Sequence, residues 1–106
     1  MVFTVMAIFK FQEGKKQEFL DMLNGPEGLS ITRAWEGCQA IEMYQSKEDS
    51  NHVFIWQKWK DKSNHESYVQ MRKESGMFDK LHKMADGEIQ IYPLAELDES
   101  SQSQSA

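Results

Sequence analysis

Residues 53–56 of this 106-residue chain read Val-Phe-Ile-Trp, an apolar run without any alternation of apolar and polar side chains. A strand in a sheet with one face in water alternates the two kinds, because successive side chains point to opposite faces. A run that is apolar on both sides therefore predicts a strand covered on both faces. In a chain this short, we expect one of the covers to come from a second copy.

Composition limits the partners that this chain can have. Its 17 acidic residues outnumber its 12 basic ones, which gives a net charge of −5. Such a chain repels phosphate and anionic lipid, so we expect neither nucleic acid nor a membrane as partner. Cys38 is the only cysteine, which excludes an internal disulfide. We predict a cytoplasmic protein with one domain at 1–95 and a disordered tail at 96–106, which has too little to bury.

Hydrophobic patterns and turn residues divide the chain into strands and helices. β-Branched and aromatic runs predict strands, and apolar residues spaced by three and four predict helices. Pro26 suits the first turn of a short helix, and Ser63 with Glu66 matches a capping box. The expected strands are 2–11, 38–45, 52–59 and 88–94, and the expected helices are 15–24, 26–35 and 63–85, the last interrupted at Ser75-Gly76.

The resulting order, βαββαβ, is the ferredoxin-like arrangement, an α+β fold with an antiparallel sheet and the helices on one face. The other face would expose Val2, Thr4, Met6 and Ile8 of the first strand. An exposed apolar patch of this kind marks an interface. A homodimer formed through the sheet faces covers the patch on both copies at once.

Five short segments together carry a family resemblance: 4–14, which ends in Gly14, Glu36-Gly37-Cys38, Trp59, the helix from Ser63 through Tyr68, and 77–94. They resemble the small proteins related to antibiotic biosynthesis monooxygenases, a family of the dimeric α/β-barrel group. The resemblance implies that two copies join their sheets into a barrel. It also implies a ligand pocket between each sheet and its own helices.

Members of that family include cofactor-independent oxygenases acting on polyphenolic or quinone-type substrates, haem-degrading enzymes, and many proteins with no known activity. The haem-degrading members look to an asparagine on the first strand and to a tryptophan and a histidine on the second helical region. Here Ala7 and Tyr68 hold the first two places, and His82 lies farther from Tyr68 than in the family pair. The resemblance therefore argues against haem degradation, and we expect no cofactor.

Tyr68 and His82 are the candidate catalytic residues, because both fall on the inward side of the second helical region. An imidazole exchanges protons near neutral pH, which suits it to removing a phenolic proton. A tyrosine hydroxyl can hold a ligand oxygen or an oxyanion. Each residue also has a structural interpretation, as a histidine at the boundary of the core and a buried tyrosine with a bonded hydroxyl.

Aromatic and methionine side chains are the candidate ligand contacts, because they adapt to flat or flexible apolar molecules. The same residue types also fill ordinary cores. The candidates are Phe9, Trp35, Trp56, Met71 and Phe78. No metal is expected, because His65-Glu66 starts the zinc-protease pattern but Val69 stands where its second histidine is required.

Two functions follow from these residues. In the first, a monooxygenase without a cofactor acts on an apolar phenolic or quinol-type molecule, with His82 as base and Tyr68 orienting the oxyanion. In the second, the pocket binds an aromatic or acyl-chain molecule without any chemistry. An orphan dimer whose pocket is only core remains a third interpretation.

Overall fold

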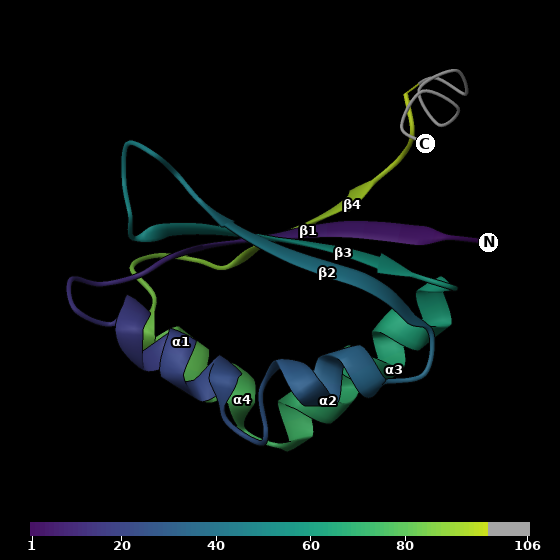
Figure 1. The fold of residues 1–106 in the computed structure, drawn as a ribbon, viewed down its shortest axis with the longest axis horizontal. Coiled ribbons are helices and arrows are strands. Elements are labelled where there is room, and N and C mark those ends of the chain that lie inside the picture. Colours follow the sequence, from purple (N-terminus) through teal and green to yellow (C-terminus); the bar gives the residue numbers. More distant parts are fainter. Residues whose placement is uncertain (98–106) are drawn as a thin grey trace.

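A four-stranded antiparallel sheet forms one layer of the molecule, and four short helices lie together on one face of it (Figure 1). This computed structural model describes residues 1–97, so most of the predicted disordered tail lies outside the described residues. The strands are β1 (Phe3–Lys10), β2 (Cys38–Gln45), β3 (His52–Trp59) and β4 (Gln90–Leu94), and the helices are α1 (Lys16–Asn24), α2 (Leu29–Ala34), α3 (Lys62–Glu74) and α4 (Met77–Met84).

The two central strands are β1 and β3, in a sheet ordered β2-β3-β1-β4. At its centre Ala7 stands opposite Ile55 on one side and Ile91 on the other. The order of elements and the antiparallel pairing confirm the predicted ferredoxin-like α+β fold. The predicted interruption of the second helical region is also confirmed, at Gly76, whose positive φ of 83° is a backbone conformation that glycine adopts without strain.

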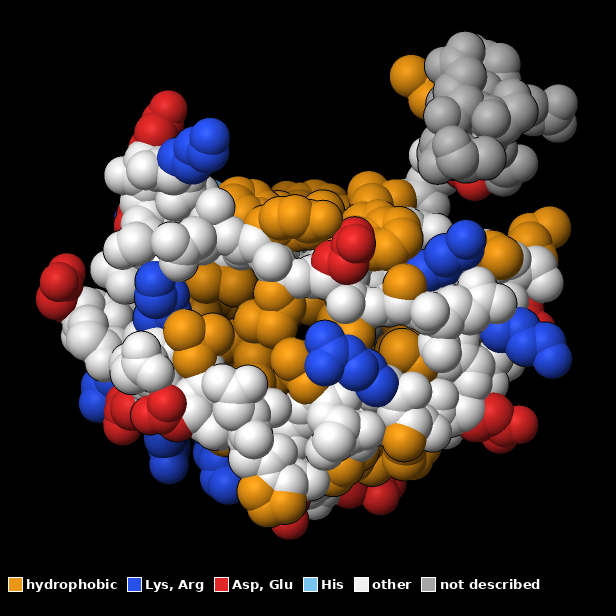
Figure 2. All heavy atoms as spheres, viewed as in Figure 1, with side chains coloured by type: hydrophobic (Ala, Val, Ile, Leu, Met, Phe, Trp, Pro, Cys, Tyr) orange, Lys and Arg blue, Asp and Glu red, His pale blue; other side chains and the backbone are white. Residues whose placement is uncertain are grey.

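Alternate residues of β1 and β3 point to opposite faces of the sheet. The set that faces the helices is buried and forms the core, together with Phe19 of α1 and Leu81 of α4. The opposite set is apolar at its centre and polar at its ends, and it is only partly buried in the single chain. Figure 2 shows hydrophobic side chains gathered along this sheet side of the molecule. The central members of this outer face are Met6, Ile8, Phe54 and Trp56.

The predicted start of the short second helix is wrong. Residues 25–28 form a turn and α2 begins at Leu29, so Pro26 does not occupy its first turn. Gly28 precedes the helix, and a Cβ there would overlap the backbone of Leu23. The residue before the helix therefore has to be glycine for the chain to pass this close to Leu23.

The predicted capping box of the third helix is also wrong. α3 begins at Lys62, one residue before Ser63, and no side chain caps its N-terminus. Glu66 instead pairs with Lys62 across 3.7 Å, a spacing of four residues that places the two side chains on one helix face.

β4 is shorter than predicted, because it begins at Gln90, and all of its residues are exposed. It is an edge strand paired only with β1. The edge position suits Pro93, which has no N–H to donate to a further strand. No helix within residues 1–97 has the length and hydrophobicity needed to cross a lipid bilayer.

Candidate functional site

The four helices bury residues of two kinds against the sheet. α1 and α4 bury the hydrophobic residues Phe19, Met77 and Leu81, whereas the buried residues of α2 and α3 are Thr32 and Arg72. Thr32 is 1% exposed and Arg72 is 4% exposed. Arginine is almost never buried to this extent unless its donors are paired. Arg72 therefore needs hydrogen-bond partners inside the core, and these partners show how this part of the core is built.

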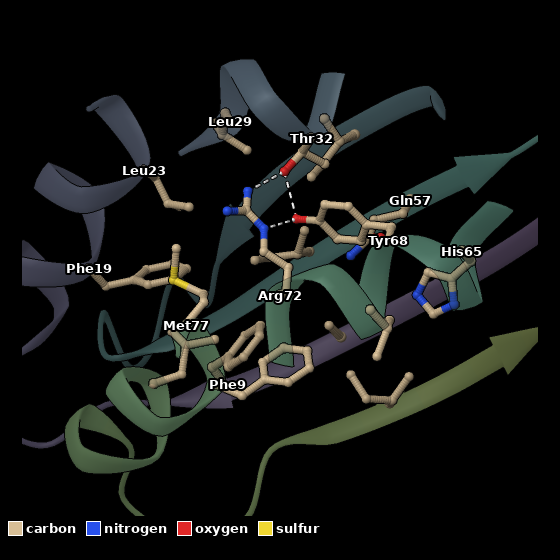
Figure 3. A pocket seen from close by; sticks show the side chains of 17 residues that line it. Phe9, Phe19, Leu23, Leu29, Thr32, Gln57, His65, Tyr68, Arg72 and Met77 are labelled. Carbon is tan, nitrogen blue, oxygen red and sulfur yellow. Dashed lines mark hydrogen bonds between the residues drawn. The ribbon is translucent and has the colours of Figure 1, made fainter. Parts of the chain in front are cut away.

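Arg72, Tyr68 and Thr32 form a closed triangle of hydrogen bonds (Figure 3). Arg72 Nε donates to the Tyr68 hydroxyl at 2.8 Å, and Arg72 Nη2 donates to Thr32 Oγ1 at 2.9 Å. The two hydroxyl oxygens lie 2.6 Å apart. When Thr32 donates its proton to Tyr68, the tyrosine keeps its own proton for a ligand.

The guanidinium of Arg72 also ties α3 to the turn before α2. Nη1 donates to the carbonyl of Glu27 at 2.8 Å, and Nη2 donates to the carbonyl of Gly28 at 2.9 Å. Among the described residues, no carboxylate lies within ion-pair distance of this cation. The neutral partners satisfy its donors but leave its positive charge uncompensated, so the region favours an anion.

A cavity of about 80 Å³ lies between the helices and the sheet beside this triangle. In Figure 3 its polar side chains gather toward one end and Phe9, Phe19 and Met77 toward the other. Ile91 of β4 also lines the cavity and is 51% exposed, so the cavity reaches the surface there. The lining residues are Ala7, Phe9, Phe19, Leu23, Leu29, Thr32, Ile41, Ile55, Gln57, His65, Tyr68, Val69, Arg72, Met77, Phe78, Leu81 and Ile91.

His65 is the histidine that lines the cavity. Its ring packs 5.3 Å from Phe3 and 5.7 Å from Trp59, measured between ring centroids. Burial lowers the pKa of His65 below its usual value of 6.5, against the smaller opposing effect of Glu66. The imidazole is therefore neutral at pH 7 and can accept a proton from a group in the cavity.

Three of the predicted site residues line the cavity, namely Tyr68, Phe9 and Phe78. Tyr68 is positioned by packing as well as by hydrogen bonds. Its ring lies 5.1 Å from that of Trp59 and meets Trp35 edge-on at 6.2 Å. Trp35, predicted as a ligand contact, is therefore a neighbour of Tyr68 and does not line the cavity.

The predicted inward orientation of His82 is wrong. The apolar stripe of α4 buries Met77 and Leu81, which leaves His82 exposed at the next position around the helix. Two predicted ligand contacts also lie elsewhere. Trp56 alternates with the cavity-lining residues of β3 and so belongs to the outer face of the sheet. Met71 precedes Arg72 on α3 and is only partly buried, outside the cavity lining.

Sequence interpretation missed four polar residues of the cavity, Thr32, Gln57, His65 and Arg72. The sequence spacing could have identified two of them. His65 and Arg72 are three residues before and four residues after Tyr68, a spacing that places all three on one helix face. In the sequence, His65 stands out only as part of an incomplete zinc pattern, and arginine is a residue type that mostly lies at the surface.

The Cys38 thiol and the possible metal ligands give no second candidate site. Burial raises the pKa of the Cys38 thiol above its usual value, an effect that Arg33 only partly offsets. A thiol with a raised pKa is a poor nucleophile at neutral pH. Within the described part of the chain, no three His, Cys, Asp or Glu side chains come together as a possible metal site.

Comparisons with known proteins agree with this architecture. The sequence model of the family described as antibiotic biosynthesis monooxygenase matches residues 2–77. No curated protein matches the chain in sequence. Many solved structures do match it in shape.

Three of these structures illustrate the range of sequence identity and TM-score. A conserved protein from Methanosarcina mazei Go1 is 22% identical with a TM-score of 0.80, over 91% of this chain and 93% of that one. Rv0793 from Mycobacterium tuberculosis is 16% identical with a TM-score of 0.79, over 94% and 99%. A structure named antibiotic biosynthesis monooxygenase is 11% identical with a TM-score of 0.73, over 92% and 100%. At these identities the likeness establishes the fold.

Proposed function

Because this chain belongs to the antibiotic biosynthesis monooxygenase family, we propose that it is a monooxygenase that needs no cofactor and transfers one atom of O₂ to a phenolic or quinol-type ring. One observation supports this most. An imidazole, a hydroxyl and an uncompensated cation, from His65, Tyr68 and Arg72, line one apolar cavity from the same face of α3. These are the groups needed to remove a phenolic proton and to stabilise the resulting anion.

In the proposed reaction, neutral His65 takes the phenolic proton. The Tyr68 hydroxyl, held by Arg72, donates to the phenolate oxygen, and the cation favours the anion inside the apolar site. The electron-rich ring passes one electron to O₂, and the two radicals join through a new carbon–oxygen bond. His65 returns the phenolic proton to the distal oxygen of the resulting peroxide. The ring carbon then loses its hydrogen as a proton, the C–H electron pair forms the new carbonyl, and the O–O bond breaks to release hydroxide. Hydroxide takes up that proton, so that phenol and O₂ give a quinone and water.

The size of the cavity limits the substrate. Its volume of about 80 Å³ is smaller than the roughly 150 Å³ of an engineered cavity that binds benzene. A single ring therefore needs either the opening at Ile91 or a shift of the flexible Met77 side chain. We expect single-ring substrates to be preferred over fused-ring ones.

Oxygen uptake with hydroquinone, corrected for uptake without protein, tests the proposal. We expect turnover that places one atom of ¹⁸O₂ in the product and the other in water. His65→Gln should abolish turnover, whereas His82→Ala, outside the cavity, should preserve it. Full turnover by His65→Gln, or product oxygen that comes from water, contradicts the proposal.

A second candidate function is binding of an apolar molecule without chemistry. The supporting observation is the apolar wall formed by residues such as Phe9, Leu23 and Phe78. Native mass spectrometry of the purified protein should then show a retained apolar molecule, and hydroquinone should cause no oxygen uptake. Absence of a retained molecule, together with turnover, favours the enzyme.

We also infer that two copies associate through the outer face of the sheet. Proteins of this family are generally dimeric. In this chain the helices cover only one face, and Met6, Ile8, Phe54 and Trp56 remain partly exposed on the other. Exposed apolar side chains that lie together on a sheet support a two-fold interface between identical faces.

A further inference from the structure

We propose that Gln57 recognises an oxygen atom of the ligand, and that Trp59 fixes the orientation in which it does so. This proposal rests on the ligand site described above and adds the chemical class of the ligand. The carboxamide of Gln57 presents its NH₂ group to the cavity, so the bound molecule carries an oxygen that accepts hydrogen bonds, such as a ketone or quinone carbonyl or an ionised phenol.

The hydrogen bond between Trp59 and Gln57 identifies the oxygen and the nitrogen of the Gln57 amide. Trp59 Nε1 lies 3.0 Å from Gln57 Oε1, and Trp59 is completely buried. The oxygen and nitrogen of an amide are usually difficult to tell apart. An indole N–H can only donate, so the atom that it meets must be the amide oxygen. The NH₂ group therefore points away from Trp59.

The NH₂ group has no protein partner among the described residues. Gln57 is 8% exposed, and its neighbours across the sheet are Val5 and Ile41, whose side chains cannot accept a hydrogen bond. Within residues 1–97, every side-chain nitrogen or oxygen that is fully buried has a partner. Because Gln57 Nε2 makes no such bond and Gln57 lines the cavity, the free surface of this atom belongs to the cavity (Figure 3).

A donor that faces a cavity gains a hydrogen bond when the ligand brings an acceptor oxygen and gains none when the ligand is a hydrocarbon. Gln57 lies on a central strand, and the indole bond holds its amide, so little order is lost when a ligand binds. The arrangement therefore selects ligands with an acceptor oxygen over hydrocarbons of the same shape.

Binding of acetophenone and α-methylstyrene tests this selection. The two molecules have the same shape, but a CH₂ group replaces the carbonyl oxygen in the second. By NMR titration we expect the protein to bind acetophenone about 3- to 10-fold more tightly, the effect of one net hydrogen bond. An equal affinity for the two molecules, or binding of neither, overturns the proposal.

Two variants test whether Gln57 causes the preference for acetophenone. Gln57→Leu should bind both molecules equally, because it removes the donor. Gln57→Glu keeps an oxygen for Trp59 but turns an acceptor toward the cavity, so it should disfavour acetophenone. Circular dichroism shows whether each variant folds. If Gln57→Leu does not fold, Gln57→Glu alone tests the assignment. Preference for acetophenone retained by a folded variant overturns the assignment.

The experiment also separates this proposal from the proposed reaction. Binding of acetophenone requires no O₂ and no proton transfer. Selection by Gln57 without any hydroquinone turnover contradicts only the monooxygenase. Turnover of hydroquinone without selection contradicts only the role of Gln57.

Discussion

Arg72 holds Tyr68 in two ways at once: its Nε donates to the tyrosine hydroxyl at 2.8 Å, and its guanidinium carbon lies 5.2 Å from the centre of the tyrosine ring. One side chain therefore restrains both the hydroxyl and the ring plane of its neighbour. The two residues are four apart on α3, so the helix itself sets their separation. Stability and the proposed chemistry should both respond to changes at this pair.

Replacing Arg72 with Met should destabilise the fold strongly. The change removes four hydrogen bonds, to Tyr68, Thr32 and the carbonyls of Glu27 and Gly28, and of these acceptors Gly28 keeps backbone donors from α2. We expect a loss of at least about 2 kcal/mol in the free energy of unfolding. Urea denaturation measures this loss. Lys73→Ala, at the next and exposed position, is the control and should change stability by less than about 0.5 kcal/mol. Similar values for the two variants would show that the buried bonds contribute little.

Replacing Tyr68 with Phe should separate catalysis from packing. The ring contacts with Trp59 and Trp35 remain, but the hydroxyl is lost, both as a donor to the phenolate and as a partner of Arg72 and Thr32. We expect oxygen uptake with hydroquinone to fall by about 100-fold, as for removal of one oxyanion donor. Near-UV circular dichroism should show an unchanged aromatic environment. Undiminished uptake would remove Tyr68 from the reaction.

Acid should destabilise the protein partly through His65. Its pKa is lowered in the folded state by burial, so below pH 6.5 the unfolded chain binds the proton more readily than the folded one. The neutral imidazole therefore stabilises the fold fully above pH 6.5, and this contribution is lost as the pH falls through the lowered folded value. Urea denaturation at pH 7.5 and pH 5 should show a smaller loss in His65→Gln than in the parent. Equal losses would contradict the burial effect.

Gly37 and Gly14 offer a matched test of crowding. Both have positive φ, 88° and 81°, so alanine should cost either site about 1–2 kcal/mol of backbone strain. A Cβ at Gly37 would also overlap the side chain of Asn64 at the start of α3, whereas nothing lies near one at Gly14. Gly37→Ala should therefore lower the melting temperature more than Gly14→Ala does. Equal shifts would mean that Asn64 moves aside freely.

Trp56→Glu should produce monomers. Trp56 lies on the outer face of β3 and outside the cavity, so a charge there would be buried only in the dimer. Analytical ultracentrifugation should show a dimer for the parent chain and a monomer for the variant. Lys80→Glu, on the exposed side of α4, should stay dimeric. A dimeric Trp56→Glu variant would place the interface elsewhere.

The sequence was sufficient for the fold because its signals were local and repeated. The apolar run at 53–56 and the helical spacing around Phe19 and Leu81 each have one simple structural explanation. Positions of helix starts were less certain, since contacts from distant segments decide them. The close approach of Gly28 to Leu23, just before α2, leaves no mark in the pattern of hydrophobicity.

The candidate site was harder to predict because some partners of its polar residues lie far away in sequence. Spacing from Tyr68 places Arg72 on the inner face of α3, but the carbonyl oxygens that accept from its guanidinium come from the turn before α2, which nothing on α3 indicates. His82 has the right chemistry but falls on the exposed side of a helix whose rotation is set by Met77 and Leu81. Residue type suggested a histidine, and packing decided which histidine lines the cavity.

The strict alternation along β3 has a consequence for how this protein can vary in length. Gln57 faces the cavity, and Trp59 lies on the same face of the sheet, only while every residue of His52–Trp59 keeps its place, because one inserted residue would turn both to the outer face. The connection at 46–51, outside the paired strands, carries no such constraint. Insertions and deletions among relatives should therefore accumulate in that connection, while β3 keeps its length.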